Sequence, residues 1–214
     1  KFMAENGSGN TVINAIDSSC RVEMFDQAVP DPTTEVVGKG LNKSAKVQPD
    51  VIIAFGGGSA IDTAKGIIYF GINGGLMKKP VFITIPTTSG TGSEVTSAAV
   101  ITDVESKSKH LIMDNDILAD IAILDPTLTL SVPPAVTANT GMDVLTHALE
   151  AYVATGANVF SDALAEKSVE LLLDSLLVCY KDGQNLAARS KMHEASTLAG
   201  MAFNTAGLGV NHSI

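Results

Sequence analysis

The chain has 214 residues, a formal net charge of −9, 45% hydrophobic residues and 17% charged residues. This balance indicates a globular protein and excludes an intrinsically disordered one. The acidic charge, without any run rich in lysine or arginine, argues against nucleic acid or an anionic membrane surface as a partner.

Hydrophobic runs and cysteines suggest the cellular setting. No apolar run approaches the roughly 18–20 residues that span a bilayer. The two cysteines, Cys20 and Cys179, lie far apart and in no ligand-like spacing, which favours reduced thiols over a disulfide. We therefore expect a cytoplasmic protein without a membrane segment.

The first half of the chain alternates strand and helix signals. Residues 21–25 have the composition of a short strand, and Asp31 followed by Pro32 predicts the start of a helix that runs to about Val47. The runs 51–55 and 81–85 are apolar without alternation, as in parallel strands covered on both faces. Further strands are predicted over 98–101 and 120–124, with the polar segment 103–110 between them.

A glycine-rich turn follows each of the two apolar strands. Residues 56–66 begin with three glycines and lead into a helix that we expect to start near Ser59. Backbone N–H groups at such a turn can hold a phosphate, although a tight strand–helix turn has the same sequence. The turn matches neither a Walker A loop nor the GxGxxG fingerprint. A second loop, 86–96, is rich in Gly, Ser and Thr, and two such loops at adjacent strand ends predict a nucleotide site.

After a double proline, Pro133 and Pro134, the strand signals stop and helical periodicity follows. One apolar face is marked by Val169, Leu172 and Leu176, and another helix is predicted over 186–202. We therefore predict an α/β domain over residues 1–132 and a helical domain over 133–214.

Asp143 and His147 are four residues apart in a helical segment, so their side chains share one face. A carboxylate and an imidazole placed in this way can bind a divalent metal. A helix-capping aspartate followed by a core histidine would give the same pattern. His212 follows a glycine-rich turn, and His193, which has charged neighbours, is expected to be exposed.

Six segments together resemble the iron-containing (group III) alcohol dehydrogenase family. They are residues 56–65, 85–96, 101–103, 124–126, 133–152 and 207–213, in the order and spacing of that family. The resemblance implies a Rossmann-like parallel-sheet nucleotide-binding domain followed by an all-helical metal-binding domain. It also implies an internal piece of a longer chain, because the family's first strand and most of its helical domain are missing.

The resemblance assigns cofactor contacts and metal ligands to individual positions. The residues that it implies for NAD are Gly57, Gly58 and Ser59 at the pyrophosphate, Thr87 and Thr88 on the adenosine side, Thr96 near the phosphates and ribose, and Lys109. The implied metal ligands are Asp143, His147 and His212. The family's fourth ligand lies beyond the end of this chain, so we expect a metal to be absent, weakly held or completed by a foreign group.

The implied reaction is reversible hydride transfer between a short primary alcohol or its aldehyde and NAD(H), with the metal as Lewis acid on the substrate oxygen. A carboxylate–imidazole ligand set suits Fe²⁺, Mn²⁺ and Zn²⁺ alike, and the resemblance implies iron. No residue is an obvious general base. Segments 85–96 and 132–152 resemble enzymes that act on ethanol, 1-propanol or 1,3-propanediol. We further expect a homo-oligomer, a dimer or larger, in the cytoplasm or in a bacterial microcompartment.

Two other interpretations remain open from the sequence. Glycerol dehydrogenases and dehydroquinate synthases have a similar architecture and normally use zinc, so the same fold could serve another reaction. The chain could also bind nucleotide without turnover.

Overall fold

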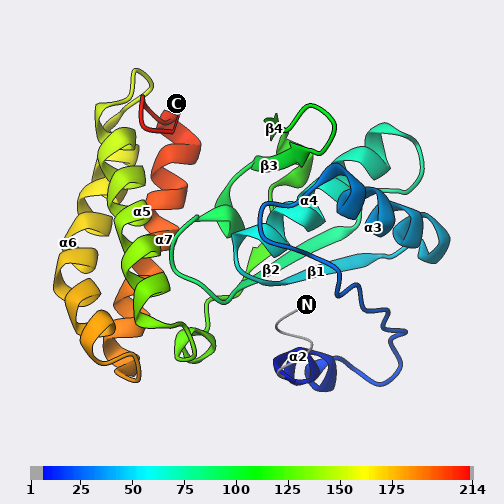
Figure 1. Cartoon of the computed structure of the whole chain (residues 1–214), viewed down its shortest axis with the longest axis horizontal. Helices are drawn as coiled ribbons and strands as arrows, with labels where there is room; N and C mark the ends of the chain where they lie inside the picture. The colour runs from blue at the N-terminus through cyan, green and yellow to red at the C-terminus, as the bar shows by residue number, and fades with distance from the viewer. Residues whose placement is uncertain (1–6, 213–214) are drawn as a thin grey trace.

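The structure is a computed structural model that describes residues 7–212 (Figure 1). An α/β part lies beside a bundle of three long helices, α5 (Pro134–Val153), α6 (Val159–Lys181) and α7 (Leu186–Ala206). This arrangement confirms the predicted fold class, a parallel sheet with helices followed by a helical part. None of the described helices is both long and apolar enough to cross a membrane.

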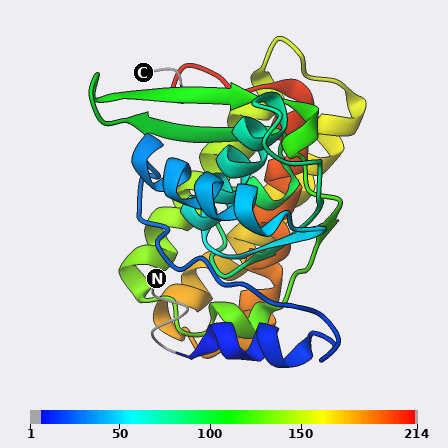
Figure 2. The same ribbon diagram turned by 90° about the vertical axis from the view of Figure 1, so that its right-hand side faces the viewer.

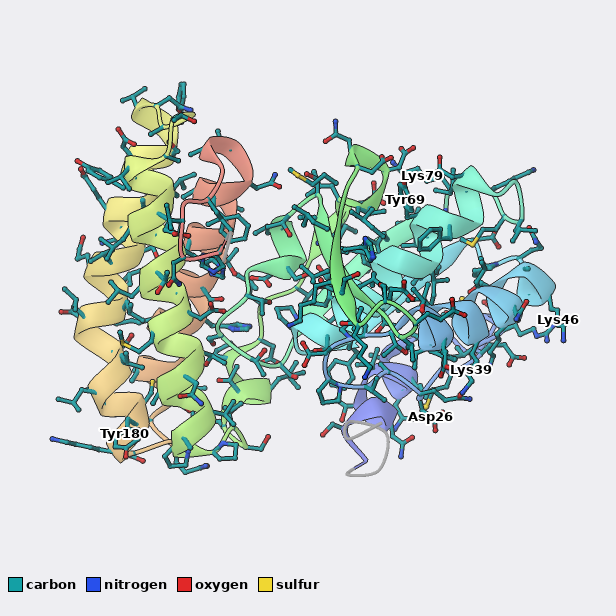
Figure 3. The ribbon with its side chains drawn as sticks, turned by 45° about the horizontal axis from the view of Figure 1, so that its top comes forward. Asp26, Lys39, Lys46, Tyr69, Lys79 and Tyr180 are labelled. Atoms are coloured by element: carbon teal, nitrogen blue, oxygen red, sulfur yellow. The ribbon has the colours of Figure 1, made fainter. Side chains whose placement is uncertain are left out.

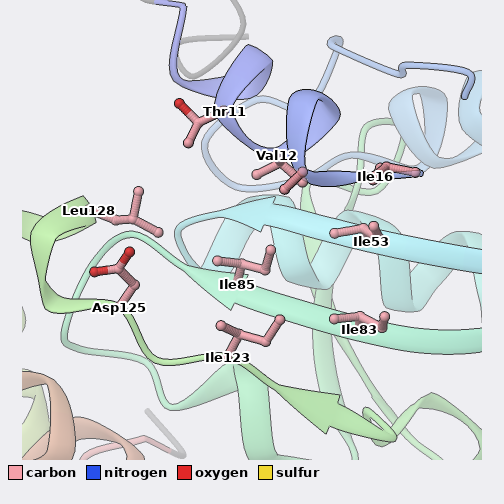
Figure 4. A pocket seen from close by; sticks show the side chains of 10 residues that line it. Thr11, Val12, Ile16, Ile53, Ile83, Ile85, Ile123, Asp125 and Leu128 are labelled. Carbon is pink, nitrogen blue, oxygen red and sulfur yellow. The ribbon is translucent and has the colours of Figure 1, made fainter. Parts of the chain in front are cut away.

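The main sheet is parallel and has the strand order β1-β2-β5. Its strands are β1 (Val51–Gly56), β2 (Val81–Pro86) and β5 (Ile121–Ala122). Helix α4 (Gly58–Asn73) packs on the face that carries Ala54 and Phe82. Helix α2 (Ser8–Ala15) lies over the other face, where an apolar pocket separates it from the isoleucines of the strands (Figure 4).

Helix α3 (Thr34–Val47) packs on the outer side of α4. Val36 and Val37 are buried, whereas Lys39 and Lys46 point away from the protein (Figure 3). This amphipathic pattern explains why the segment forms a surface helix. Its N-cap is Thr33, whose hydroxyl accepts a hydrogen bond from the Val36 N–H at 3.3 Å.

β3 (Ala98–Asp103) and β4 (Ser108–Met113) form an antiparallel hairpin. The sequence predicted a strand at 98–101 but none at 108–113, part of which lies in the polar segment 103–110. The hairpin lies at the opposite end of the α/β part from α2 (Figure 2). Three short 3-10 helices, η1 (Ser93–Val95), η2 (Asn115–Ile117) and η3 (Pro126–Thr129), complete the connections.

The helical bundle has an apolar core of its own, built largely from alanines that let the helices approach closely. Asn158 caps α6 in a capping box with Ser161, and Asn185 caps α7 through the Ala188 N–H. The buried Arg189 guanidinium binds the carbonyls of Val132 and Gly183. Residue 132 is therefore tied to the bundle, and the division into domains at that point stays a prediction.

Three predicted elements differ from the structure. Residues 21–25 form no strand, because no described strand lies beside them to complete a ladder. Asp31 does not cap α3, since the helix begins two residues after Pro32, and its own backbone has a positive φ of 49°. The predicted strand at 120–124 is confirmed but shorter, although hydrogen bonds to β2 continue on both sides of β5.

Candidate metal and cofactor site

Asp143 and His147 lie one turn apart on α5, and His212 reaches them from the segment after α7. Asp143 Oδ1 is 3.9 Å from His147 Nε2 and 3.6 Å from His212 Nε2. One ligand atom from each residue lies within 4.8 Å of the other two. The structure therefore brings together the three residues that the sequence singled out as metal ligands.

The position of Asp143 within α5 argues against the alternative interpretation of this pair. The helix begins at Pro134, with proline in its first turn, where the missing N–H costs nothing. Asp143 therefore lies in the middle of the helix rather than at its N-cap. Its carboxylate shares one helix face with His147, which is buried.

His147 is placed to act as a neutral ligand. Burial lowers the pKa of this imidazole, against the opposing effect of the Asp143 carboxylate. Its ring packs against Phe203, with centroids 4.6 Å apart, and stacks on His212 at 4.4 Å. Its Nδ1 is buried, and an interaction with the Gly90 backbone also opposes the fall in the pKa. A neutral imidazole is the form that binds divalent metals.

Glu150 orients His212, a role that the sequence analysis missed. Its Oε2 lies 2.5 Å from His212 Nδ1, and its Oε1 accepts a hydrogen bond from the Asn211 N–H at 2.6 Å. Partial burial opposes ionisation of Glu150, but the hydrogen bonds from His212, Asn211 and Gly209 outweigh it and lower the pKa of the carboxyl. With the Nδ1 proton donated to Glu150, the Nε2 lone pair of His212 points towards Asp143.

The three side chains fit a divalent metal by their chemistry. One carboxylate oxygen and two imidazole nitrogens form a mixed set that suits Zn²⁺, Fe²⁺ or Mn²⁺. Asp143 Oδ1 lies within 3.9 Å of both imidazole nitrogens, which suits a shared ion, since bonds of about 2 Å to one centre bring ligand atoms within about 3–4 Å of one another.

The predicted phosphate turn lies at the N-terminus of α4. Gly57 is the N-cap, and the helix begins at Gly58. The first amides of a helix lack intrahelical partners, so those of Gly58 and Ser59 can donate to a phosphate. A Cβ atom on Gly58 would lie 2.6 Å from Thr91 Oγ1, so the close approach of the second loop requires a glycine there.

The threonines of the second loop fall into two groups. Thr88 lies beside the glycine turn, because a Cβ on Gly57 would be 3.0 Å from its hydroxyl, and Thr87 donates its N–H to Gly56 at 3.0 Å. Thr96 is buried, and its hydroxyl accepts a hydrogen bond from Lys65 Nζ at 3.0 Å. The structure therefore brings Thr87 and Thr88 to the turn and directs the Thr96 hydroxyl inward.

Lys109 lies on β4 with an exposed side chain and forms an ion pair with Asp31 at 2.9 Å. Its contact in this structure is thus a surface carboxylate, and its role at a cofactor stays a prediction.

The expectation that His193 is exposed is wrong. The residue is 2% exposed, and its Nδ1 lies 2.9 Å from the hydroxyl of Ser89. Charged neighbours in sequence misled the prediction. Lys191 and Glu194 are exposed on other faces of α7, whereas Arg189, one turn before His193, is buried like His193 itself.

A second buried group missed by sequence reasoning is Lys65. Its ammonium donates to the carbonyls of Ser93, Thr96 and Ala98, at 2.6 to 2.8 Å. Of the acidic residues near it, Glu94 is buried and Asp62 is partly buried, and burial raises the pKa of both carboxyls. Sequence offered one signal, since Lys65 follows Ile61 by four residues and therefore lies on the apolar face of α4.

Two family descriptions match the chain. That of iron-containing alcohol dehydrogenase covers residues 1–126, and that of the C-terminal part of Fe-containing alcohol dehydrogenases covers residues 137–214. The chain belongs to the iron-containing alcohol dehydrogenase family. This confirms the resemblance seen in the sequence segments.

Individual relatives agree with this assignment. The 1-propanol dehydrogenase PduQ of Citrobacter freundii is 51% identical over 213 residues, which are 100% of this chain and 57% of the relative. This chain thus spans little more than half the length of that curated relative. The structure of sulfoacetaldehyde reductase from Bifidobacterium kashiwanohense in complex with NAD⁺ has a TM-score of 0.92 and 32% identity, over 100% of this chain and 60% of the other. A 1,3-propanediol oxidoreductase structure has a TM-score of 0.84 and 40% identity, over 88% of this chain and 52% of the other.

Proposed function

We propose that this chain carries the cofactor loops and three metal ligands of an alcohol dehydrogenase that uses NAD(H) and a divalent metal to interconvert a short primary alcohol and its aldehyde. The observation that carries the proposal is the convergence of Asp143, His147 and His212 from two separate segments of the helical bundle. The similarity to a 1-propanol dehydrogenase and to a 1,3-propanediol oxidoreductase supports a short alcohol as the substrate.

Each part of the proposed site has its own role. A bound metal supplies a Lewis acid for the substrate oxygen. His147 offers a neutral nitrogen from a buried position, and Glu150 holds the proton of His212 on Nδ1. The amides at the start of α4 bind the pyrophosphate, and the loop that carries Thr87 and Thr88 lines the cofactor beside them.

Iron is the metal suggested by the family, and zinc or manganese would suit the same ligands. NAD is suggested by the NAD⁺ complex of a relative with 32% identity.

The proposal is tested by metal and cofactor binding to the purified chain. Titration calorimetry with Zn²⁺, Mn²⁺ and anaerobic Fe²⁺ is expected to show one site per chain, and His212→Ala should weaken it by about tenfold or more. His110→Ala, which removes an exposed histidine on β4, serves as the matched control and should bind metal like the wild type.

Activity is measured separately, as NADH loss with propanal after metal loading. Metal binding with NADH binding but no turnover would support a binding role for this chain alone. Metal affinity that is unchanged in His212→Ala would contradict the proposed site.

A further inference from the structure

One face of α7 carries a row of residues that meet the loop of the proposed cofactor site. His193, Thr197, Gly200 and Asn204 follow one another at intervals of four, three and four residues. These intervals place them on one side of a helix. We call them the α7 stripe. The opposing residues all come from positions 89–97, the end of the loop that also carries Thr87 and Thr88.

Two buried hydrogen bonds form the first half of the contact. Ser89 Oγ lies 2.9 Å from His193 Nδ1, and Thr197 Oγ1 donates to Glu94 Oε1 at 2.7 Å. All four residues are buried. Hydrogen bonds away from water are strong and directional, so they define one position of the loop.

The second half of the contact is close backbone packing followed by a side-chain cap. A Cβ on Gly92 would lie 2.6 Å from Gly200 Cα, so neither position leaves room for a side chain. Beyond it, Asn204 Oδ1 accepts the Ser97 N–H at 2.9 Å and the Ser97 hydroxyl at 3.1 Å. The loop is thus held along three turns of α7.

The contact joins the two halves of the proposed site. The same loop packs against the glycine turn through Thr88 and Thr91. Helix α7 packs on α5, which carries His147, and continues into the segment with His212. Any shift of the loop along α7 would therefore change the separation between the cofactor turn and the three ligand residues.

Close packing alone does not explain why a histidine stands at position 193 of the stripe. Its Nε2 is buried and has no hydrogen-bond partner among the described residues. Leaving such a group unpaired is unfavourable, and an apolar residue at this position would avoid that cost. Burial also lowers the pKa of His193 to about 4, so the ring is neutral near pH 7 and bonds Ser89 without adding a charge.

We propose that His193 is a positioning residue, which through Ser89 sets the proposed cofactor loop against α7 and thereby against the three metal-ligand side chains. The inference rests on the proposed function. It predicts that removing the imidazole lowers the affinity for the cofactor by more than the accompanying loss of folding stability explains.

The test compares His193→Ala, His193→Asn and Met192→Ala in the whole chain. Asparagine can place an amide group near the position of Nδ1, whereas alanine cannot. Met192 is the neighbouring residue in the core of the bundle and makes no hydrogen bond to the loop, so its truncation controls for a general loss of stability. NADH affinity is measured from the fluorescence of bound NADH, and amide hydrogen exchange is followed over residues 87–97.

We expect His193→Ala to weaken NADH binding by about tenfold and to speed exchange in the loop. His193→Asn should recover most of the affinity, and Met192→Ala should lower the thermal midpoint while leaving NADH affinity within about twofold. In a double variant, Ser89→Ala should add little to His193→Ala.

Two outcomes overturn the inference on its own. In one, the wild-type chain binds NADH and His193→Ala binds it equally well. In the other, Met192→Ala loses as much affinity as His193→Ala, which would make the role purely structural. A wild-type chain that binds no NADH would overturn the proposed function, and the inference with it.

Discussion

At the scale of single residues, Glu150 determines the tautomer and the ring orientation in which His212 can bind a metal. It lies on the same face of α5 as Asp143 and His147, and both of its oxygens contact the segment that carries His212. A carboxylate that accepts the Nδ1 proton fixes the tautomer of a ligand histidine and its ring orientation.

We predict that Glu150→Gln weakens metal binding while the chain stays folded. The amide oxygen can still accept from the backbone of Gly209 and Asn211, but the NH₂ group would face the Nδ1 proton and favour the other tautomer, which removes the Nε2 lone pair. Zn²⁺ affinity, measured by competition with a chromophoric chelator, should fall by about 10-fold to 100-fold. Glu170→Gln, which breaks an exposed ion pair with Lys167 on α6, is the control and should leave affinity unchanged.

At the scale of elements, the loop after β2 lies between α4 and α7. Helix α7 holds it through the stripe, and α4 holds it through Lys65, whose ammonium gathers the carbonyls of Ser93, Thr96 and Ala98. One helix face thus fixes η1 and the start of β3 together. The Lys65 ammonium is thus a buried positive charge beside the proposed cofactor loop.

This buried charge predicts a pH dependence of stability. Burial lowers the pKa of Lys65 from 10.5 to about 8 in the folded chain. Between pH 8 and pH 10.5, Lys65 is protonated in the unfolded chain but not in the folded chain, so the free energy of unfolding rises with pH across this window. Below pH 8 the folded chain also carries the ammonium, and the full cost of burying that charge lowers its stability. The full difference is on the order of 3 kcal/mol.

Urea unfolding across this pH window checks the prediction by comparing the wild type with Lys65→Met. The wild type should gain stability relative to the variant as the pH rises. Lys46→Met, at an exposed site on α3, should follow the slope of the wild type. An identical slope in the wild type and Lys65→Met would show that the ammonium keeps its proton throughout.

At the scale of the whole molecule, the proposed metal site joins segments that are far apart in the chain. Asp143 and His147 belong to α5, and His212 follows the end of α7, so a bound ion would cross-link α5 to the segment after α7. A ligand that binds the folded chain alone raises its stability by mass action.

We expect Zn²⁺ at about 100 times its dissociation constant to stabilise the chain by about 2.7 kcal/mol, seen in calorimetry as a higher thermal midpoint that EDTA reverses. Asp143→Ala should abolish the increase. Asp174→Ala, on the exposed side of α6, should retain it. An equal increase in both variants would place the metal elsewhere.

Much of the fold could be predicted because its signals are local. The apolar runs that became β1 and β2, the glycine turn that begins α4 and the periodicity of α6 and α7 are all written in short segments. The family could also be recognised, since its segments keep their order along the chain. The sequence paired Asp143 with His147 through helical spacing alone, and their role with His212 stays a prediction.

Tertiary structure alone decided which polar residues are buried and what they contact. His193 has charged neighbours in sequence, yet it lies in the interior, because helix packing selects a face that local composition does not reveal. Helical spacing put Lys65 on the apolar face of α4, but the carbonyls that its ammonium contacts come from a loop distant in sequence. The strand expected at 21–25 did not form, since a strand requires a hydrogen-bonded neighbour. Local patterns thus determined the elements and the candidate ligands, whereas the pairing of the loop with α7 depended on contacts more than a hundred residues apart in sequence, which no local pattern encodes.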